Sequence, residues 1–298
     1  MSHDPIHPEI GPYDFFEFTK DINHPGTYLI GFEFDGTACF RKGTKHGPDA
    51  IRSVSTGIES YSPYLDADLE DIQGLYDLGN VPVLNTDDQE KNWQAGTDSF
   101  LKLCEGVSLK EKNIKILTLG GEHSISYAPL KTYLENYEDL VVLHLDAHAD
   151  LRDGYEGYHY SHASIIRRAL DHMTDKHQLI QYGIRSGTKE EYVWMNEHKT
   201  IRKSLEDFLT SVKDIDDQRP IYLTLDLDYF DPSFLPGTGT PEAGGETFHS
   251  FIKLMKILRN KNFVGADIVE LAPTIDPTGN SDVFATKVTR ETILALNS

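Results

Sequence analysis

Short apolar runs alternate with longer amphipathic segments along most of this chain. Several short runs are continuously apolar instead of alternating with polar residues, which is typical of strands buried on both faces of a sheet. The pattern predicts strands over residues 28–34, 114–119, 140–145, 179–184, 221–225 and 263–269, with a weaker one near residues 75–78. The amphipathic segments predict helices over residues 48–55, 88–104, 124–137, 161–172, 247–259 and 281–296.

This alternation of strand and helix predicts the α/β class, a three-layer α/β/α fold with a largely parallel central sheet covered on both faces. No internal repeat, low-complexity segment or linker-like change of composition interrupts it, so we expect a single domain over residues 1–298. In such sheets the chemistry lies at the carboxyl ends of the strands. Candidate residues are therefore sought where each predicted strand ends.

The charge balance narrows the choice of partners. The chain has 28 Lys and Arg residues against 48 Asp and Glu residues, a formal net charge of −20. Such a chain repels phosphate backbones, so we expect no nucleic-acid partner. It tolerates or attracts a small cation, although solubility alone explains the same charge equally well.

Cysteine usage and hydropathy bear on the compartment. Cys39 and Cys104 are too few for a secreted disulfide framework, which favours a reduced, cytoplasmic location. No signal peptide is visible at the N-terminus, and no apolar run approaches the ~20 residues needed to span a bilayer. We therefore expect no membrane partner.

The first candidate strand end is ILTLGGEHS, residues 116–124. An apolar strand runs into two glycines that permit a sharp turn, and His123 follows. Taken alone, His123 is more simply interpreted as a turn histidine.

The second strand end is VVLHLDAHAD, residues 141–150. Asp146, His148 and Asp150 lie two residues apart, so in extended backbone their side chains share one side. One imidazole between two carboxylates suits a divalent metal such as Mn²⁺. His144 lies within the apolar run and is interpreted as a structural or supporting residue.

The third strand end is IYLTLDLDYFDP, residues 221–232. Asp226 and Asp228 again share a side, and neighbouring carboxylates are costly unless a cation compensates them. A solvated loop without an ion is the simpler alternative for each segment alone. Together they supply two His and four Asp, more than one ion needs, so the sequence predicts a two-metal centre whose bridging water becomes a nucleophile.

Other active-site motifs are absent. The sequence contains no H-E-x-x-H, no G-x-x-x-x-G-K-[ST] and no G-x-S-x-G. The glycine-rich segment at residues 237–245 lacks the flanking strand and helix of a dinucleotide site, and we expect an ordered loop there.

At the three metal motifs the sequence resembles the ureohydrolase family of arginases and agmatinases, and agmatinase most of all. Gly-Gly-Glu-His-Ser, Asp-Ala-His-Ala-Asp and Asp-Leu-Asp-Tyr-Phe-Asp-Pro are similar to the family's motifs and occur in the same order. Residues 47–52 resemble its N-terminal motif, and residues 236–242 resemble its active-site loop. The likeness runs from about residue 30 to the C-terminus.

The resemblance implies an arginase/deacetylase-like fold and two divalent ions, most simply Mn²⁺, each held by a histidine and an aspartate. His123 and Asp150 would hold one ion, His148 and Asp228 the other, and Asp146 and Asp226 would bridge them. The implied reaction is hydrolysis of a guanidino group to urea and an amine, by attack of a metal-bridging hydroxide.

Two further roles follow from the same resemblance. His162, in Tyr-Ser-His-Ala, would carry protons, since the pKa of an imidazole lies near neutrality. Glu270, in Gly-Ala-Asp-Ile-Val-Glu, would hold the substrate guanidinium through paired hydrogen bonds. A helix-capping histidine and an ordinary strand-end glutamate are the simpler alternatives.

The motifs indicate the type of reaction more closely than they indicate the substrate. Residues 151–156 depart from the Asn-containing stretch with which arginases bind an α-carboxylate, and they resemble agmatinase. The resemblance implies hydrolysis of agmatine to putrescine and urea, a step of polyamine biosynthesis. The acidic side chains of Asp153 and Glu156 would favour the free amine of agmatine. Arg152, however, offers a partner for a guanidino acid.

Several alternatives stay open. Arginine, guanidinobutyrate, formiminoglutamate and guanidine are the rival substrates. Zinc deacetylases share a related fold but carry adjacent histidines, which this chain lacks, and the Gly-Asn-His-Asp/Glu motif of binuclear phosphatases is absent too. A non-enzymatic binding module is the third hypothesis. The resemblance also implies a homo-oligomer, a trimer or hexamer.

Overall fold

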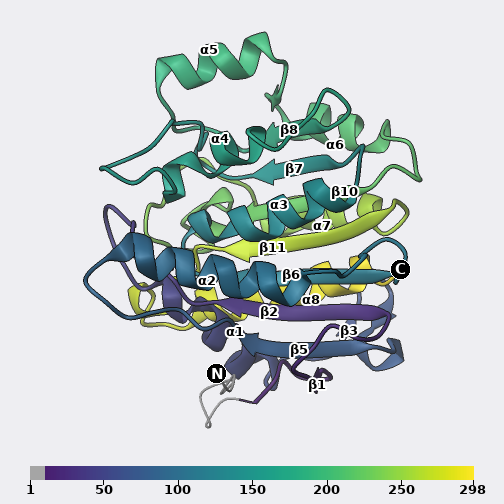
Figure 1. The fold of residues 1–298 in the computed structure, drawn as a ribbon. Coiled ribbons are helices and arrows are strands. Elements are labelled where there is room, and N and C mark those ends of the chain that lie inside the picture. The colour runs from purple at the N-terminus through teal and green to yellow at the C-terminus, as the bar shows by residue number, and fades with distance from the viewer. Residues whose placement is uncertain (1–10) are drawn as a thin grey trace.

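A computed structural model of the chain describes residues 11–298. Its centre is a nine-stranded sheet in which every neighbouring pair of strands is parallel, in the order β1-β5-β2-β6-β11-β10-β7-β8-β9. All of its carboxyl ends therefore point to the same edge, as the arrows in Figure 1 show. The strands are β1 (Glu17–Phe18), β2 (Gly26–Phe32), β5 (Leu75–Asn80), β6 (Ile114–Gly120), β7 (Val141–Leu145), β8 (Gln178–Tyr182), β9 (Ile201–Arg202), β10 (Ile221–Asp226) and β11 (Phe263–Val269).

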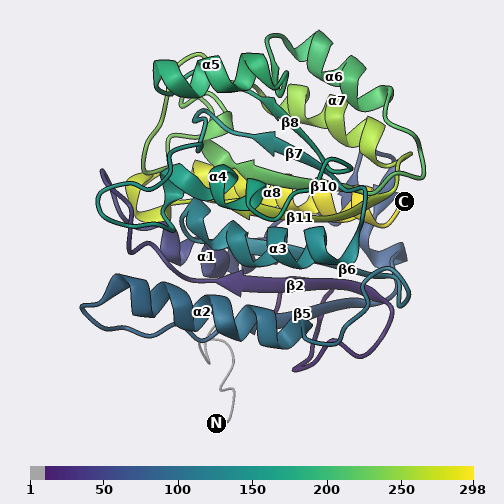
Figure 2. The same ribbon diagram turned by 45° about the horizontal axis from the view of Figure 1, so that its top comes forward.

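Helices cover both faces of this sheet. One layer holds α2, α3 and α4, and the opposite layer holds α1, α8, α7 and α6 (Figures 1 and 2). The helices are α1 (Gly47–Ser55), α2 (Gln89–Cys104), α3 (Tyr127–Asn136), α4 (Ile165–Leu170), α5 (Lys189–Glu197), α6 (Leu205–Lys213), α7 (Phe248–Leu258) and α8 (Asn280–Leu296). A short antiparallel pair, β3 (Tyr61–Ser62) with β4 (Ala67–Asp68), lies apart from the sheet.

The continuous apolar runs are explained by this two-sided burial. All five residues of β7 are buried, and their side chains alternate between two hydrophobic cores. Leu143 and Leu145 pack into the core on one face, whereas Val142 packs into the core on the other. Because both faces of the strand meet a helix layer, neither tolerates a polar residue without a partner.

The predicted fold class is confirmed, and each predicted strand is present within about two residues of its expected bounds. Two predicted helices begin differently: residues 123–126 and 162–164 form 3₁₀ turns, and α3 and α4 start only after them. Helices α5 and α6 and the short strands at both sheet edges were not predicted from the sequence. A signal for α5 was present, since Thr188 and Glu191 form a capping box.

The hydropathy of the sequence predicts no membrane-spanning segment, and the helices of the structure were compared with the length and apolarity that a bilayer requires. Within residues 11–298, none of the helices is long and apolar enough to cross a bilayer.

Candidate metal centre

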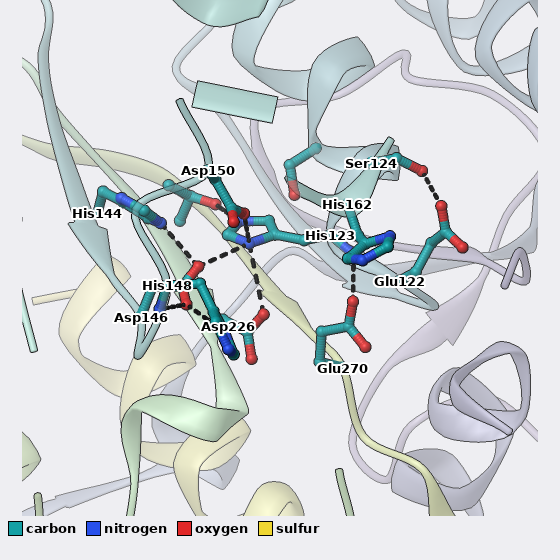
Figure 3. Close-up of polar contacts among 12 residues, drawn as sticks. Glu122, His123, Ser124, His144, Asp146, His148, Asp150, His162, Asp226 and Glu270 are labelled. Carbon is teal, nitrogen blue, oxygen red and sulfur yellow. Dashed lines mark hydrogen bonds and ion pairs between the residues drawn. The ribbon is translucent and has the colours of Figure 1, made fainter. Parts of the chain in front are cut away.

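Four adjacent strands in the middle of the sheet bring the candidate residues together. His123 follows β6, Glu270 follows β11, Asp226 ends β10 and Asp146 follows β7. The strand ends lie level, because Ile268 pairs with Leu119, Asp226 with Val269, and Leu225 with Leu145. Side chains more than a hundred residues apart in the chain thus meet at one edge of the sheet (Figure 3).

The first group of ligand atoms surrounds His123. Its Nδ1 lies 3.0 Å from Asp146 Oδ2, 3.1 Å from Asp150 Oδ2 and 3.4 Å from Asp226 Oδ2. All four side chains are buried. One imidazole nitrogen thus faces three carboxylate oxygens, a donor set that suits a divalent cation.

The second group surrounds His148, which lies nearer the surface. Its Nδ1 is 2.9 Å from Asp228 Oδ2 and 3.5 Å from Asp146 Oδ1. Asp146 therefore belongs to both groups, with one oxygen turned to each (Figure 3). The two groups are two potential metal positions that share a carboxylate.

Two buried atoms support the assignment of these groups to metal. Nδ1 of His123 and Oδ2 of Asp228 are buried, and neither makes a properly directed hydrogen bond to any part of the chain from residue 11 onward. Buried polar atoms without a partner are rare and need an explanation. Burial, followed by repulsion from Asp228 and Asp146, raises the pKa of Asp226 well above its usual range. Divalent cations would give the orphaned atoms partners and compensate the carboxylates.

A buried hydrogen-bond chain orients His123. Asp267 on β11 accepts hydrogen bonds from the hydroxyls of Thr224 (2.7 Å), Tyr222 (2.8 Å) and Ser126 (2.8 Å). Since the Thr224 hydroxyl donates to Asp267, its oxygen accepts from His123 Nε2 at 2.9 Å. The proton of the imidazole is thereby placed on Nε2, and the Nδ1 lone pair is left for a metal.

His144 supports Asp146 in a similar way. Gln181 Nε2 lies 3.1 Å from His144 Nδ1, and Thr200 donates to Gln181 Oε1 at 2.8 Å, which fixes the orientation of the amide. The amide donates to Nδ1, so Nε2 carries the proton and donates to Asp146 Oδ2 at 2.8 Å. This contact agrees with the interpretation of His144 as a supporting residue.

Thr224, Asp267 and Gln181 were not predicted from the sequence. Their signal was a polar residue inside an otherwise apolar strand, as in IYLTLD and FVGADIV. Such a residue is costly to bury unless it has partners. Here the hydrogen bonds lead from Asp267 through Thr224 to His123, and from Gln181 through His144 to Asp146.

Backbone geometry is unusual at two of the candidate residues. Asp150 and Glu270 adopt positive φ angles of 54° and 69°, which are uncommon for residues other than glycine. The side chain of Glu270 is oriented by a hydrogen bond, because its Oε1 accepts the backbone N–H of His123 at 2.7 Å. Burial and the neighbouring Glu122 raise the pKa of Glu270 well above its usual range. A cation beside this carboxylate would therefore be bound favourably.

A cavity of about 260 Å³ opens onto the metal groups. The candidate residues on its wall are His123, His148, Asp150, His162, Asp226 and Glu270. Arg152 also lines it, with its guanidinium 4.8 Å from the ring centroid of Tyr155. The structure does not bring Asp153 to this cavity: its side chain is 88% exposed and pairs with Arg168 at 2.7 Å. Adjacent residues of a loop point to different sides, and the sequence did not reveal which.

His162 also lines the cavity, and Figure 3 shows it apart from Asp146 and Asp226. Its Nδ1 and its backbone nitrogen both lie 3.3 Å from Thr37 Oγ1. Burial, with the nearby histidines, lowers the pKa of His162 to about 4. The imidazole is therefore neutral at pH 7 and able to accept a proton.

Comparisons with known proteins agree with this geometry. A family model described as the Arginase family matches residues 26–295. Agmatinase from Bacillus subtilis is 38% identical over 271 residues, which cover 89% of this chain and 90% of that protein. Agmatinase from Bacillus anthracis is 37% identical over 274 residues, with the same coverage of 89% and 90%.

A solved structure extends the likeness to three dimensions. The crystal structure of a putative agmatinase from Clostridium difficile superposes with a TM-score of 0.82 at 36% identity, covering 92% of this chain and 98% of that one. The family match spans the four strands that carry the His and Asp groups, and the relatives and the solved structure are similar over most of the chain. This chain therefore belongs to the arginase family, as a ureohydrolase with a divalent-metal site.

Proposed function

We propose that this enzyme hydrolyses the guanidino group of agmatine, giving putrescine and urea. The observation that carries the proposal is the pair of His/Asp groups, joined by Asp146, that opens onto the same cavity as Glu270 and His162. The similarity to agmatinases supports the choice of agmatine. Urea release from a panel of guanidino compounds, with each divalent metal supplied separately, tests it.

The six His and Asp ligands would hold two ions in this proposal. His123 and Asp150 would hold one ion, His148 and Asp228 would hold the other, and Asp146 and Asp226 would be shared by both. When bound, such ions supply a nucleophile at neutral pH and stabilise developing negative charge. Mn²⁺ is our choice of metal, because mixed imidazole and carboxylate ligands suit it.

The remaining residues bind substrate and move protons. Glu270 offers a carboxylate already oriented by the His123 N–H, and a guanidinium pairs with a carboxylate through two parallel hydrogen bonds. His162, neutral and on the cavity wall, takes up a proton during attack and returns it to the departing amine. Without that proton the amine is a poor leaving group.

A guanidino acid is the second candidate substrate, and Arg152 is the observation that favours it. Between residues 11 and 298 no carboxylate lies within ion-pair distance of its guanidinium, which lies over Tyr155 and lines the cavity. An arginine in this state can bind a substrate carboxylate. The formal charge of −20 opposes an anionic substrate, and for this reason agmatine remains our first choice.

Steady-state kinetics separate the two candidates. We expect kcat/KM for agmatine to exceed that for arginine by at least about tenfold, because an unpaired carboxylate is costly to desolvate. Arg152→Ala should change kcat/KM for agmatine by less than about threefold. Arg167→Ala, which removes an arginine paired with Asp171 on the surface, is the matched control. A preference for arginine or guanidinobutyrate that Arg152→Ala abolishes would replace agmatine as the substrate.

We also propose that the chain acts as one domain in the cytoplasm and forms trimers or hexamers. The free cysteines Cys39 and Cys104 support a reducing compartment. Light scattering of the purified enzyme tests the assembly.

A further inference from the structure

We infer that Glu122 is a positioning residue that acts through Thr37 to hold His162 as its Nδ1–H tautomer, leaving Nε2 as the nitrogen that exchanges protons. The inference deepens the proposed function, because it rests on the role of His162 as proton carrier. It concerns two residues, Glu122 and Thr37, to which the metal and substrate assignments give no role.

Glu122 is completely buried, with 0% of its surface exposed. Its carboxylate accepts three hydrogen bonds. Thr37 N–H donates to Oε2 at 2.8 Å, the Ser124 hydroxyl donates to Oε1 at 2.6 Å, and the Thr37 hydroxyl also donates to Oε1. Burial raises the pKa of Glu122 to about 7, and the hydrogen bonds from Ser124 and Thr37 oppose that rise by favouring the ionised form. The ionised carboxylate is an acceptor only, and these donors satisfy it from both oxygens.

The hydroxyl of Thr37 has three neighbours for one hydrogen and two lone pairs. The backbone N–H of His162 can only donate, so it occupies one lone pair, at 3.3 Å. The single hydrogen is directed to Glu122, which can only accept. One lone pair remains for His162 Nδ1, also at 3.3 Å, and a lone pair there requires that Nδ1 carry the proton.

The tautomer of His162 follows from this assignment of donors and acceptors around the Thr37 hydroxyl. With the proton on Nδ1, the lone pair of Nε2 is available, and no side chain or backbone group of residues 11–298 hydrogen-bonds to it. The Tyr155 ring packs edge-on against the imidazole, with centroids 5.6 Å apart, and this restricts its rotation. If the Thr37 hydroxyl instead donated its hydrogen to His162 Nδ1, Nδ1 would be the unprotonated nitrogen. That nitrogen would then face Thr37 instead of the substrate.

Glu122 is adjacent to His123, so a loss of activity in a Glu122 variant could arise from lost metal. The kinetic test is therefore centred on Thr37, which lies in a different segment. Thr37→Val removes the hydroxyl at nearly constant volume, whereas Thr37→Ser keeps it. Thr97→Val is the matched control, because Thr97 is a buried threonine on α2 whose hydroxyl makes no hydrogen bond to any described residue.

We expect Thr37→Val to lower kcat about 10- to 100-fold, with KM and bound metal unchanged. This is less than the ~10²–10⁴-fold that acid–base catalysis supplies, because the imidazole itself remains. Thr37→Ser should recover most of this loss, and Thr97→Val should leave kcat at the wild-type level. Glu122→Gln should lower kcat similarly while retaining metal, because an amide in place of the carboxylate lets the Thr37 hydroxyl turn its hydrogen toward His162 Nδ1. In a His162→Asn background, Thr37→Val should cause no further loss.

Neutron diffraction provides a readout independent of activity and of the substrate. We expect deuterium on His162 Nδ1 and on Thr37 Oγ1, the latter directed at Glu122. Deuterium on Nε2 instead of Nδ1, or a full additional loss from Thr37→Val in the His162→Asn background, would overturn the inference. Loss of metal together with activity in both Thr37→Val and Glu122→Gln would also overturn it, since their role would then be structural. If agmatine proves inactive while the deuterium positions are as expected, the proposed substrate is at fault and the positioning role stands.

Discussion

Asp228→Ala should abolish nearly all urea release while the protein remains folded. Oδ2 of Asp228 is buried, makes no directed hydrogen bond within the described chain and lies 2.9 Å from His148 Nδ1. Removing it leaves Asp146, which is shared with the His123 group, as the carboxylate neighbour of His148 Nδ1 in the described chain. The ion held by His148 should therefore be lost.

The expected loss of kcat is at least about 10³-fold, the upper range for removing one electrostatic partner from an active site. Bound metal should fall from two ions per chain to one. Elemental analysis, urea release and circular dichroism measure the three quantities. Asp98→Ala is the matched control, since Asp98 is an exposed residue of α2 that contacts Gln94. Full activity of the wild type with a single ion per chain would disprove the two-metal proposal.

His162→Asn should have the second-largest effect, and it should separate turnover from metal binding. His162 lies on the cavity wall but contributes no atom to either ligand group. Its loss removes a neutral imidazole positioned to carry a proton, which typically costs ~10²–10⁴-fold in kcat. Asparagine retains a polar side chain near Thr37, so the packing of the segment should change little. Metal content should remain at the wild-type level.

Kinetics and elemental analysis of the same preparation decide the outcome. His249→Asn is the control, because His249 is an exposed histidine on α7. A His162→Asn enzyme that keeps its rate but loses metal would make His162 a ligand and not a proton carrier. A variant that keeps both would assign proton transfer to another group.

The sequence by itself determined the strands and the ligand types. Two-sided burial demands continuous apolar residues, so β6, β7, β10 and β11 were recognisable, and polar residues at their carboxyl ends stood out against that background. The spacing of Asp146, His148 and Asp150 placed them on one side of a single segment before any fold was known. Both the strand pattern and the residue types depend only on residues close together in the chain, so the sequence pattern reveals them.

Tertiary structure decided everything that depends on which strands are neighbours. Residues 141–145 and 221–226 are joined in the sheet although some eighty residues separate them, and no periodicity encodes that pairing. For the same reason Thr224 and Asp267 emerged as partners of His123 only in three dimensions. Loop direction was equally hidden, so Asp153 proved to pair with Arg168 at the surface while Arg152 lines the cavity. The chemistry of a side chain follows from its residue type, which can be read directly from the sequence. Its contacts depend on how distant segments pack against one another.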